Sequence, residues 1–154
     1  MNSIQLKRIR KEMLDISKVS SETFTAGPKS DADLLNWEVK LYGPKDTPYE
    51  GGEFLLDLIL PPGYPFHPPT LKFVTDIFHP NVLPGGAICI PMLKTDQWKP
   101  ACKLLTIIDI AVNLLAHPSE EDAIEGDAAD LYKRDRQKYE KTAREWTTKY
   151  ATPS

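Results

Sequence analysis

Cys89 is the residue of this sequence best suited to covalent chemistry, and its surroundings are unusual for a cysteine. It lies in the stretch FHPNVLPGGAICIPM, residues 78–92, between two isoleucines and shortly after a run of proline and glycine. A cysteine between isoleucines is usually inert core, whereas a nucleophilic thiol needs exposure and partial thiolate character. The turn-forming run at 84–86 favours exposure of the neighbouring backbone. The local sequence therefore leaves a packed thiol and a reactive thiol both open.

Two polar residues upstream of Cys89 are candidates to assist it. An oxyanion forms when a thioester is attacked, and the side-chain amide of Asn81 could donate a hydrogen bond to it. His79 is the nearest imidazole in sequence, and a cysteine protease would need such a base. The sequence FHPN suits a turn-stabilising histidine and a capping asparagine equally well. Catalytic and structural roles for His79 and Asn81 therefore both stay open at this point.

Composition and charge restrict the classes of protein to which this chain can belong. A chain of 154 residues predicts one domain, 1–154, with a sizeable core. The net charge of −3 argues against a nucleic-acid-binding protein. Cys89 and Cys102 form neither a disulfide framework nor a zinc-binding pattern, so we expect no metal and a reducing compartment. Since we find no signal-peptide core and no membrane-length apolar run, we expect a monomer in the cytoplasm or nucleus, without a membrane partner.

The first half of the chain predicts one helix followed by strands. Leu6, Ile9, Met13 and Ile16 recur at helical spacing, with basic residues on the other face. We expect a weak strand near 21–25 and a loop around Ala26-Gly27-Pro28. Three clearer strands follow, LLNWEVKLYG, EFLLDLILP and TLKFVT, and the second alternates with Phe54, Leu56, Leu58 and Leu60 on one face. Strands joined by such short loops must be antiparallel neighbours.

The second half of the chain predicts helices. From Leu104 to Leu115 apolar residues surround the helix axis, which is typical of a buried helix packed across a sheet. Residues 127–151 read as helical, and Asp135 is a plausible N-cap that divides them into two pieces. The sequence therefore predicts an α+β fold with an N-terminal helix, a four-stranded antiparallel meander sheet and C-terminal helices.

Several motifs together resemble one known family. The spacing HPN, seven residues, then Cys resembles the active-site signature of the ubiquitin-conjugating enzymes. Other stretches resemble landmarks of that family in the same order: GPKDTPYEGG (43–52), YPFHPP (64–69), WKPA (98–101) and DRQKYEKTAREWTTKYA (135–151). The resemblance extends from Leu6 to Tyr150, nearly the whole chain. It implies the fold of that family and requires no metal or organic cofactor.

The resemblance also implies a reaction. Cys89 would accept the carboxy terminus of ubiquitin from the thioester of an activating enzyme, in an ATP-dependent pathway, and pass it to a ligase cysteine or a substrate lysine. A thioester is already activated, so no strong base beside the cysteine is needed. Asn81 matches the family's asparagine, which is assigned either to the oxyanion or to holding the active-site loop. His79 and Pro91 belong to that loop.

One position departs from the family pattern. A lysine attacks only as the free amine although its ordinary pKa is ~10.4, and lysine-reactive members use two acidic residues to orient it. Where the first is expected, two places after the cysteine, this chain has Pro91; the second matches Asp122. Pro91 and WKPA resemble the subgroup that serves HECT and RING-between-RING ligases, which carries histidine where this chain has Asp122. The sequence therefore predicts a hybrid with efficient transfer to thiols and weakened transfer to lysine.

The resemblance assigns two docking surfaces. Lys7, Arg8 and Lys11 on the first helix match the face where the activating enzyme and ligases of the HECT, RING-between-RING or RING type dock. The other surface is a pair of loops that match the family's ligase-binding loops, with these residues: Phe66, Lys99, Pro100 and Ala101. The ordinary alternatives are a solvated helix face and a satellite of the core.

Three other functions remain as alternatives. The first is a carrier of NEDD8 or SUMO, although this acidic chain lacks the basic character and longer insertion of the SUMO enzyme and the amino-terminal extension of the NEDD8 enzymes. The second is an adaptor that binds ubiquitin or ligases without catalysis. The third, a cysteine hydrolase, is the least favoured, because no oriented base can be named.

Overall fold

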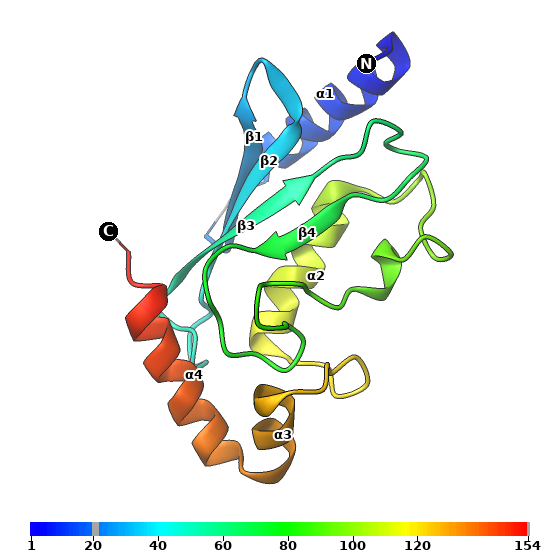
Figure 1. Cartoon of the computed structure of the whole chain (residues 1–154). Coiled ribbons are helices and arrows are strands. Elements are labelled where there is room, and N and C mark those ends of the chain that lie inside the picture. The colour runs from blue at the N-terminus through cyan, green and yellow to red at the C-terminus, as the bar shows by residue number, and fades with distance from the viewer. Residues whose placement is uncertain (20–21, 154) are drawn as a thin grey trace.

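The chain folds in the predicted order of one helix, strands and then helices. The computed structural model describes residues 1–19 and 22–153. Its helices and strands have these bounds: α1 (Ser3–Ser17), β1 (Phe24–Ser30), β2 (Asp33–Tyr42), β3 (Glu53–Ile59), β4 (Thr70–Phe73), a 3₁₀ helix (Pro91–Leu93), α2 (Leu104–Ala116), α3 (Asp127–Arg134) and α4 (Arg136–Tyr150). Figure 1 shows α2 lying across one face of the sheet, with α1 at one end of the molecule and α3 and α4 at the other. The α+β prediction is confirmed.

The sheet is the predicted antiparallel meander, with the order β1-β2-β3-β4. Phe54, Leu56 and Leu58 alternate along β3 on the face that is fully buried, as their period of two predicts. The register places them beside buried residues of β2 and β4, such as Val39 and Phe73 opposite Leu56. This apolar face and the buried residues of α2 form the core: Leu104, Ile107, Ile108, Ala111 and Leu115. Within the described residues no helix is long and apolar enough to cross a membrane.

Strand β1 is longer than the sequence predicted. The prediction of a loop at residues 26–28 is wrong, because Ala26, Gly27 and Pro28 pair with β2 in the antiparallel ladder. β1 is an edge strand with a neighbour on one side only, so a proline is tolerated there although it lacks an N–H group. The register also shifts directly after Pro28. Of the weak strand expected near 21–25, Phe24 and Thr25 lie in β1, and Ser21 lies outside the described residues.

The buried face of helix α1 contains two polar and two apolar residues. The side chain of Asn2 caps the helix by accepting a hydrogen bond of 2.8 Å from the Gln5 N–H. The buried residues follow the helical period as Gln5, Ile9, Glu12 and Ile16, whereas Leu6 and Met13 are only half-buried. The helix is therefore held partly by buried hydrogen bonds rather than by apolar packing alone.

The two C-terminal helices meet at Asp135, as predicted. Its side chain caps α4 by accepting a hydrogen bond of 3.1 Å from the Lys138 N–H. Further along α4, the hydroxyl of Tyr139 pairs with that of Tyr49, which donates to the Phe78 carbonyl at 2.7 Å. Helix α4 is thereby anchored to the segment that leads towards Cys89.

Candidate active site

The glycine run before Cys89 folds this segment back against β4. The carbonyl of Gly86 accepts a 2.9 Å hydrogen bond from the Phe73 N–H, and Ala87 forms an isolated bridge with Lys72. Gly86 has φ of +98°, and a Cβ atom there would lie 2.0 Å from the Phe73 oxygen, so only glycine fits. The turn-formers therefore place the chain just before Cys89 along the edge of the sheet.

Cys89 is a free, half-buried cysteine. Its backbone N–H donates to the Asn81 carbonyl at 3.0 Å, and Ile90 beside it is buried in the core. The 3₁₀ helix begins at the exposed Pro91. Ile90 thus packs in the core while Cys89 stays partly accessible, and such access is one of the conditions for a reactive thiol.

Asn81 ties the segment of Cys89 to the loop before α3. The residue is fully buried, with 0 % exposure. Its Nδ2 donates to the Ser119 carbonyl at 2.8 Å, and its Oδ1 accepts from the Ser119 N–H at 2.9 Å. Removing this side chain would leave the N–H and carbonyl groups of the half-buried Ser119 without their bonds, at a cost of about 2 kcal/mol. Asn81 therefore has a structural role, in which one of the two Nδ2 hydrogens is used.

His79 is a turn-stabilising residue in this structure. It is 1 % exposed, its Nδ1 accepts from the Asn81 N–H at 3.0 Å, and its Nε2 donates to the Leu114 carbonyl at 2.6 Å. Burial lowers the pKa of His79 to about 4 from 6.5, and the bond to Leu114 only partly opposes this shift. The ring is therefore neutral, with both nitrogens engaged, and it has no lone pair to act as a base for Cys89.

Asp122 lies on a loop that is fastened next to the HPN segment at two points. One is the Asn81–Ser119 pair, and the other is a 2.9 Å hydrogen bond from the Ile124 N–H to the Pro80 carbonyl. Between them, the Ser119 hydroxyl donates to the half-buried Asp122 carboxylate at 3.3 Å. The loop therefore brings Asp122 to the region of the HPN segment, and its neighbours Glu120 and Glu121 are exposed.

The two predicted docking loops are joined to each other. The buried Trp98 donates its Nε1–H to the Pro65 carbonyl at 2.7 Å, and its ring lies 6.1 Å from that of Tyr64. Beside these contacts Phe66 is 70 % exposed on the first loop. On the second loop the exposed residues are Lys99, Pro100 and Ala101. The structure thus places the four predicted loop residues on a connected pair of loops.

The three basic residues of α1 that were predicted to dock partners differ in exposure. Lys7 and Lys11 are exposed, as a docking face requires. Arg8 is engaged within the molecule, because its Nε donates to Glu12 at 3.1 Å and its terminal nitrogen donates to the Cys102 carbonyl at 2.7 Å. Lys7 and Lys11 are therefore the cations of this set that face solvent most freely.

Sequence reasoning missed three residues that hold the candidate site and its loops. Ser119 fixes the Asp122 loop, and Gln5 and Glu12 lie on the buried side of α1. The burial of Gln5 and Glu12 could have been predicted, because they lie at the same helical spacing as Ile9 and Ile16. No pattern in the sequence distinguishes Ser119 from other loop serines.

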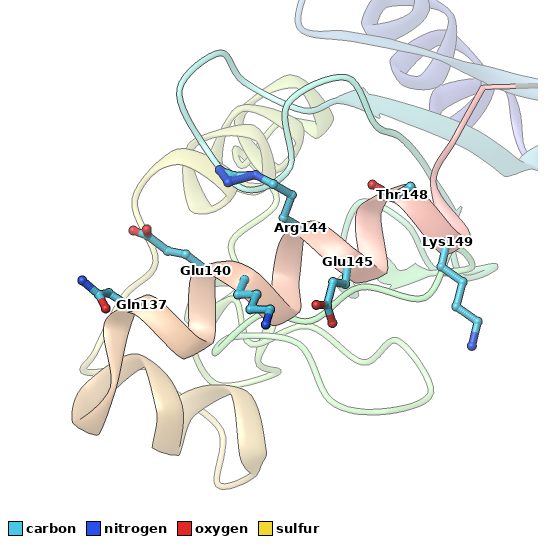
Figure 2. Close-up of a pocket in the computed structure, with 7 residues that line it drawn as sticks. Gln137, Glu140, Arg144, Glu145, Thr148 and Lys149 are labelled. Atoms are coloured by element: carbon cyan, nitrogen blue, oxygen red, sulfur yellow. The ribbon is translucent and has the colours of Figure 1, made fainter.

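The outer face of α4 is a separate surface. Figure 2 shows its long side chains projecting outward, with both charges represented. All of the residues that line it are exposed: Gln137, Glu140, Lys141, Arg144, Glu145, Thr148 and Lys149. Since none is a predicted site residue and none is buried, this face is a solvated helix surface rather than a second candidate site.

Comparisons with known proteins identify the family of the whole chain. The family model described as ubiquitin-conjugating enzyme matches residues 8–147. The crystal structure of a candidate ubiquitin conjugating enzyme from Plasmodium yoelii superposes with a TM-score of 0.90 and 37 % sequence identity, covering 100 % of this chain and 99 % of that one. A match over most of the chain, with this identity and the HPN–Cys89 arrangement, shows that the protein belongs to the ubiquitin-conjugating enzyme family.

Proposed function

We propose that this protein carries ubiquitin as a thioester on Cys89. Membership of the family implies a transferase that works with ubiquitin, an activating enzyme and ligases. The observation that carries the proposal is a free, partly accessible Cys89 on a segment that Asn81 fixes to the opposing loop. The thiolate of Cys89 attacks the carbonyl of the activating-enzyme thioester, a new C–S bond forms and the old one breaks. The cysteine of the activating enzyme leaves as thiolate and takes up the proton that Cys89 released.

The second step transfers the acyl group from Cys89 to another nucleophile. Attack by a ligase thiolate or a lysine amine gives a tetrahedral oxyanion, and the free Nδ2 hydrogen of Asn81 is the donor that we assign to it. Pro91 offers no carboxylate, so Asp122 alone is left to orient an amine. This difference supports transfer to the cysteine of a HECT or RING-between-RING ligase as the main route, with weaker direct transfer to lysine with RING ligases.

The docking assignments form part of the same proposal. Lys7 and Lys11 present positive charge on α1, and Phe66 with Pro100 and Ala101 presents apolar surface on the joined loops. An exposed aromatic residue held by buried neighbours is suited to anchor a partner. We assign the first surface to the activating enzyme and to ligases, and the second to ligases.

A loading reaction tests the proposal. Purified protein is incubated with ATP and, in separate reactions, ubiquitin, NEDD8 or SUMO with the matching activating enzyme, and the products are compared with and without reductant. We expect a reductant-sensitive adduct with ubiquitin that Cys89→Ala abolishes and Cys102→Ser retains.

The same reaction separates the alternative functions. A preference for NEDD8 or SUMO would assign the protein to another modifier. If no adduct formed with any of the three, the non-catalytic adaptor would be the remaining hypothesis. The buried, fully bonded His79 already counts against a cysteine hydrolase that uses this residue as its base.

A further inference from the structure

Glu12 is a buried carboxylate that contacts three separate parts of the chain. It is 4 % exposed and lies on the inner side of α1. Its Oε1 accepts from the Leu104 N–H at 2.8 Å. Its Oε2 accepts from the Tyr64 hydroxyl and from Arg8 Nε, the latter at 3.1 Å. Every one of these bonds is charge-assisted, which makes this carboxylate a strong attachment point for its partners.

The bond to Leu104 fixes the start of α2. Leu104 is the first residue of that helix, and its N-cap, Lys103, makes no side-chain capping bond. The first N–H groups of a helix need acceptors from elsewhere, and a negative charge there also suits the helix dipole. Glu12 therefore acts as a remote cap for α2 from a position 92 residues earlier.

Two neighbours on α1 extend the network of Glu12. Gln5 donates through Nε2 to the carbonyls of Pro62 and Tyr64 at 2.5 and 2.8 Å. Arg8 donates to the Cys102 carbonyl at 2.7 Å and lies 5.8 Å from the centre of the Tyr64 ring. We call Gln5, Arg8 and Glu12 the α1 clamp.

The α1 clamp holds both docking loops close to their exposed tips. Tyr64 lies two residues before Phe66 on the first loop, and Cys102 directly follows Ala101 on the second. In Figure 1 the turns around residues 60–70 and 95–103 lie at the end of the molecule where α1 begins. Since hydrogen bonds fix distance and direction whereas apolar packing is less directional, the clamp sets the separation of the loops more strictly than packing would.

We propose that Glu12 is a positioning residue for ligase docking, because it sets the relative position of the loops that carry Phe66 and Ala101. The inference rests on the proposed function, since it assumes that ligases bind these loops. Glutamine has nearly the shape of glutamate but only one acceptor oxygen, so Glu12→Gln turns an N–H group towards the donors on one side of the clamp. The loops then keep the direct Trp98–Pro65 bond but lose the second support of their spacing, while Cys89 and its segment keep their contacts.

The test measures transfer from the loaded enzyme to a purified HECT domain that is active with the wild-type protein. In Glu12→Gln we expect the HECT concentration at half-maximal rate to rise about tenfold, while the maximal rate and the ligase-free discharge to cysteine stay within about twofold. Tyr64→Phe removes one bond of the clamp and should give a smaller effect in the same direction. Tyr139→Phe is the matched control, because it removes a buried hydroxyl contact on α4.

Amide hydrogen exchange in the unloaded protein gives a second readout. We expect faster exchange in Glu12→Gln confined to residues 62–67 and 99–105. An unchanged half-saturating concentration, or an equal rise in Tyr139→Phe, would overturn the positioning role. If the wild-type protein loads no modifier at all, the proposed function itself fails; if it loads normally and only the Glu12 effect is missing, this inference alone fails.

Discussion

At the scale of single residues, Cys89 depends on neighbours that hold the backbone rather than on a base. His79 has both nitrogens bonded and Asn81 uses its amide to bind Ser119. The sequence left structural and catalytic roles open for these two residues, and the contacts identify the structural role of each. Because a thioester needs no strong base for transfer, this arrangement is sufficient for the proposed chemistry.

Pro91 and Asp122 lead to a prediction about which acceptor, thiol or amine, the loaded protein prefers. Near neutral pH only about one lysine in a thousand is a free amine, so its orientation limits transfer to lysine. We expect Pro91→Asp to raise discharge to free lysine by about tenfold and Asp122→Asn to lower it by about tenfold, with discharge to free cysteine changed less than twofold in both. Single-turnover discharge of the loaded enzyme measures these rates.

The chain offers a control for this comparison. Glu121→Gln removes an exposed carboxylate beside Asp122 and should leave both discharge rates unchanged. If wild-type protein discharges to lysine as fast as Pro91→Asp, the position after the cysteine does not set the preference. Pro91 is exposed at the first position of its 3₁₀ helix, where a negative charge suits the N-terminal end, so the substitution should preserve the fold.

At the scale of elements, the sequence predicted regular structure best where one physical rule decided it. The structure confirms the alternation along β3, the helix predicted from apolar residues at 104–115 and the N-cap at Asp135. Prediction failed where tertiary context overrides local preference. Pro28 is tolerated in β1 because that edge strand pairs on one side only. Glu12 is buried where it bonds to Tyr64 on a distant loop and to the first residue of α2.

Helix α1 leads to a prediction about loading. Lys7→Ala with Lys11→Ala should lower kcat/KM for loading by the activating enzyme about tenfold, more strongly at low salt, because exposed charges steer association. Both side chains are exposed, so the midpoint of urea unfolding should not change. Lys141→Ala with Lys149→Ala on the outer face of α4 removes the same charge. An equal loss of loading in that control would show that only net charge matters.

At the scale of the whole molecule, the buried His79 links stability to pH. Its folded pKa is about 4 and its unfolded value 6.5, so the unfolded state binds the proton more tightly. The stability from this residue is complete above pH 6.5 and is lost as pH falls towards 4. We expect the free energy of unfolding to fall by about 2 kcal/mol from pH 7 to pH 5 through this one group.

Urea unfolding at the two pH values measures this linkage. His79→Gln replaces the ring with a side chain that can also accept and donate but does not titrate. Its stability should change less between pH 7 and pH 5 than that of the wild-type protein. Equal pH dependence in the two proteins would mean that other groups cause the loss.

The folded structure explains why the contacts that support the candidate site could not be predicted from the sequence. The HPN segment and the loop at residues 119–124 are about 40 positions apart in the chain, and the fold brings them together through the bonds of Asn81 to Ser119 and of Ile124 to Pro80. The motif HPN–Cys89 indicated the family, yet the pairing of Asn81 with Ser119 depends on this packing. The proposed chemistry therefore came from the family resemblance, whereas the contacts that support the site could be seen only in the fold.

The mass of the loaded protein tests the central claim, that Cys89 carries the acyl group. After incubation with ubiquitin, activating enzyme and ATP, we predict that wild-type protein gains one ubiquitin less one water and loses it when an excess of a thiol reductant takes over the acyl group by exchange. Cys89→Ser should form an oxygen ester that survives reduction and is cleaved by alkali. An adduct that persists in Cys89→Ala, or that maps to Cys102, would contradict the account.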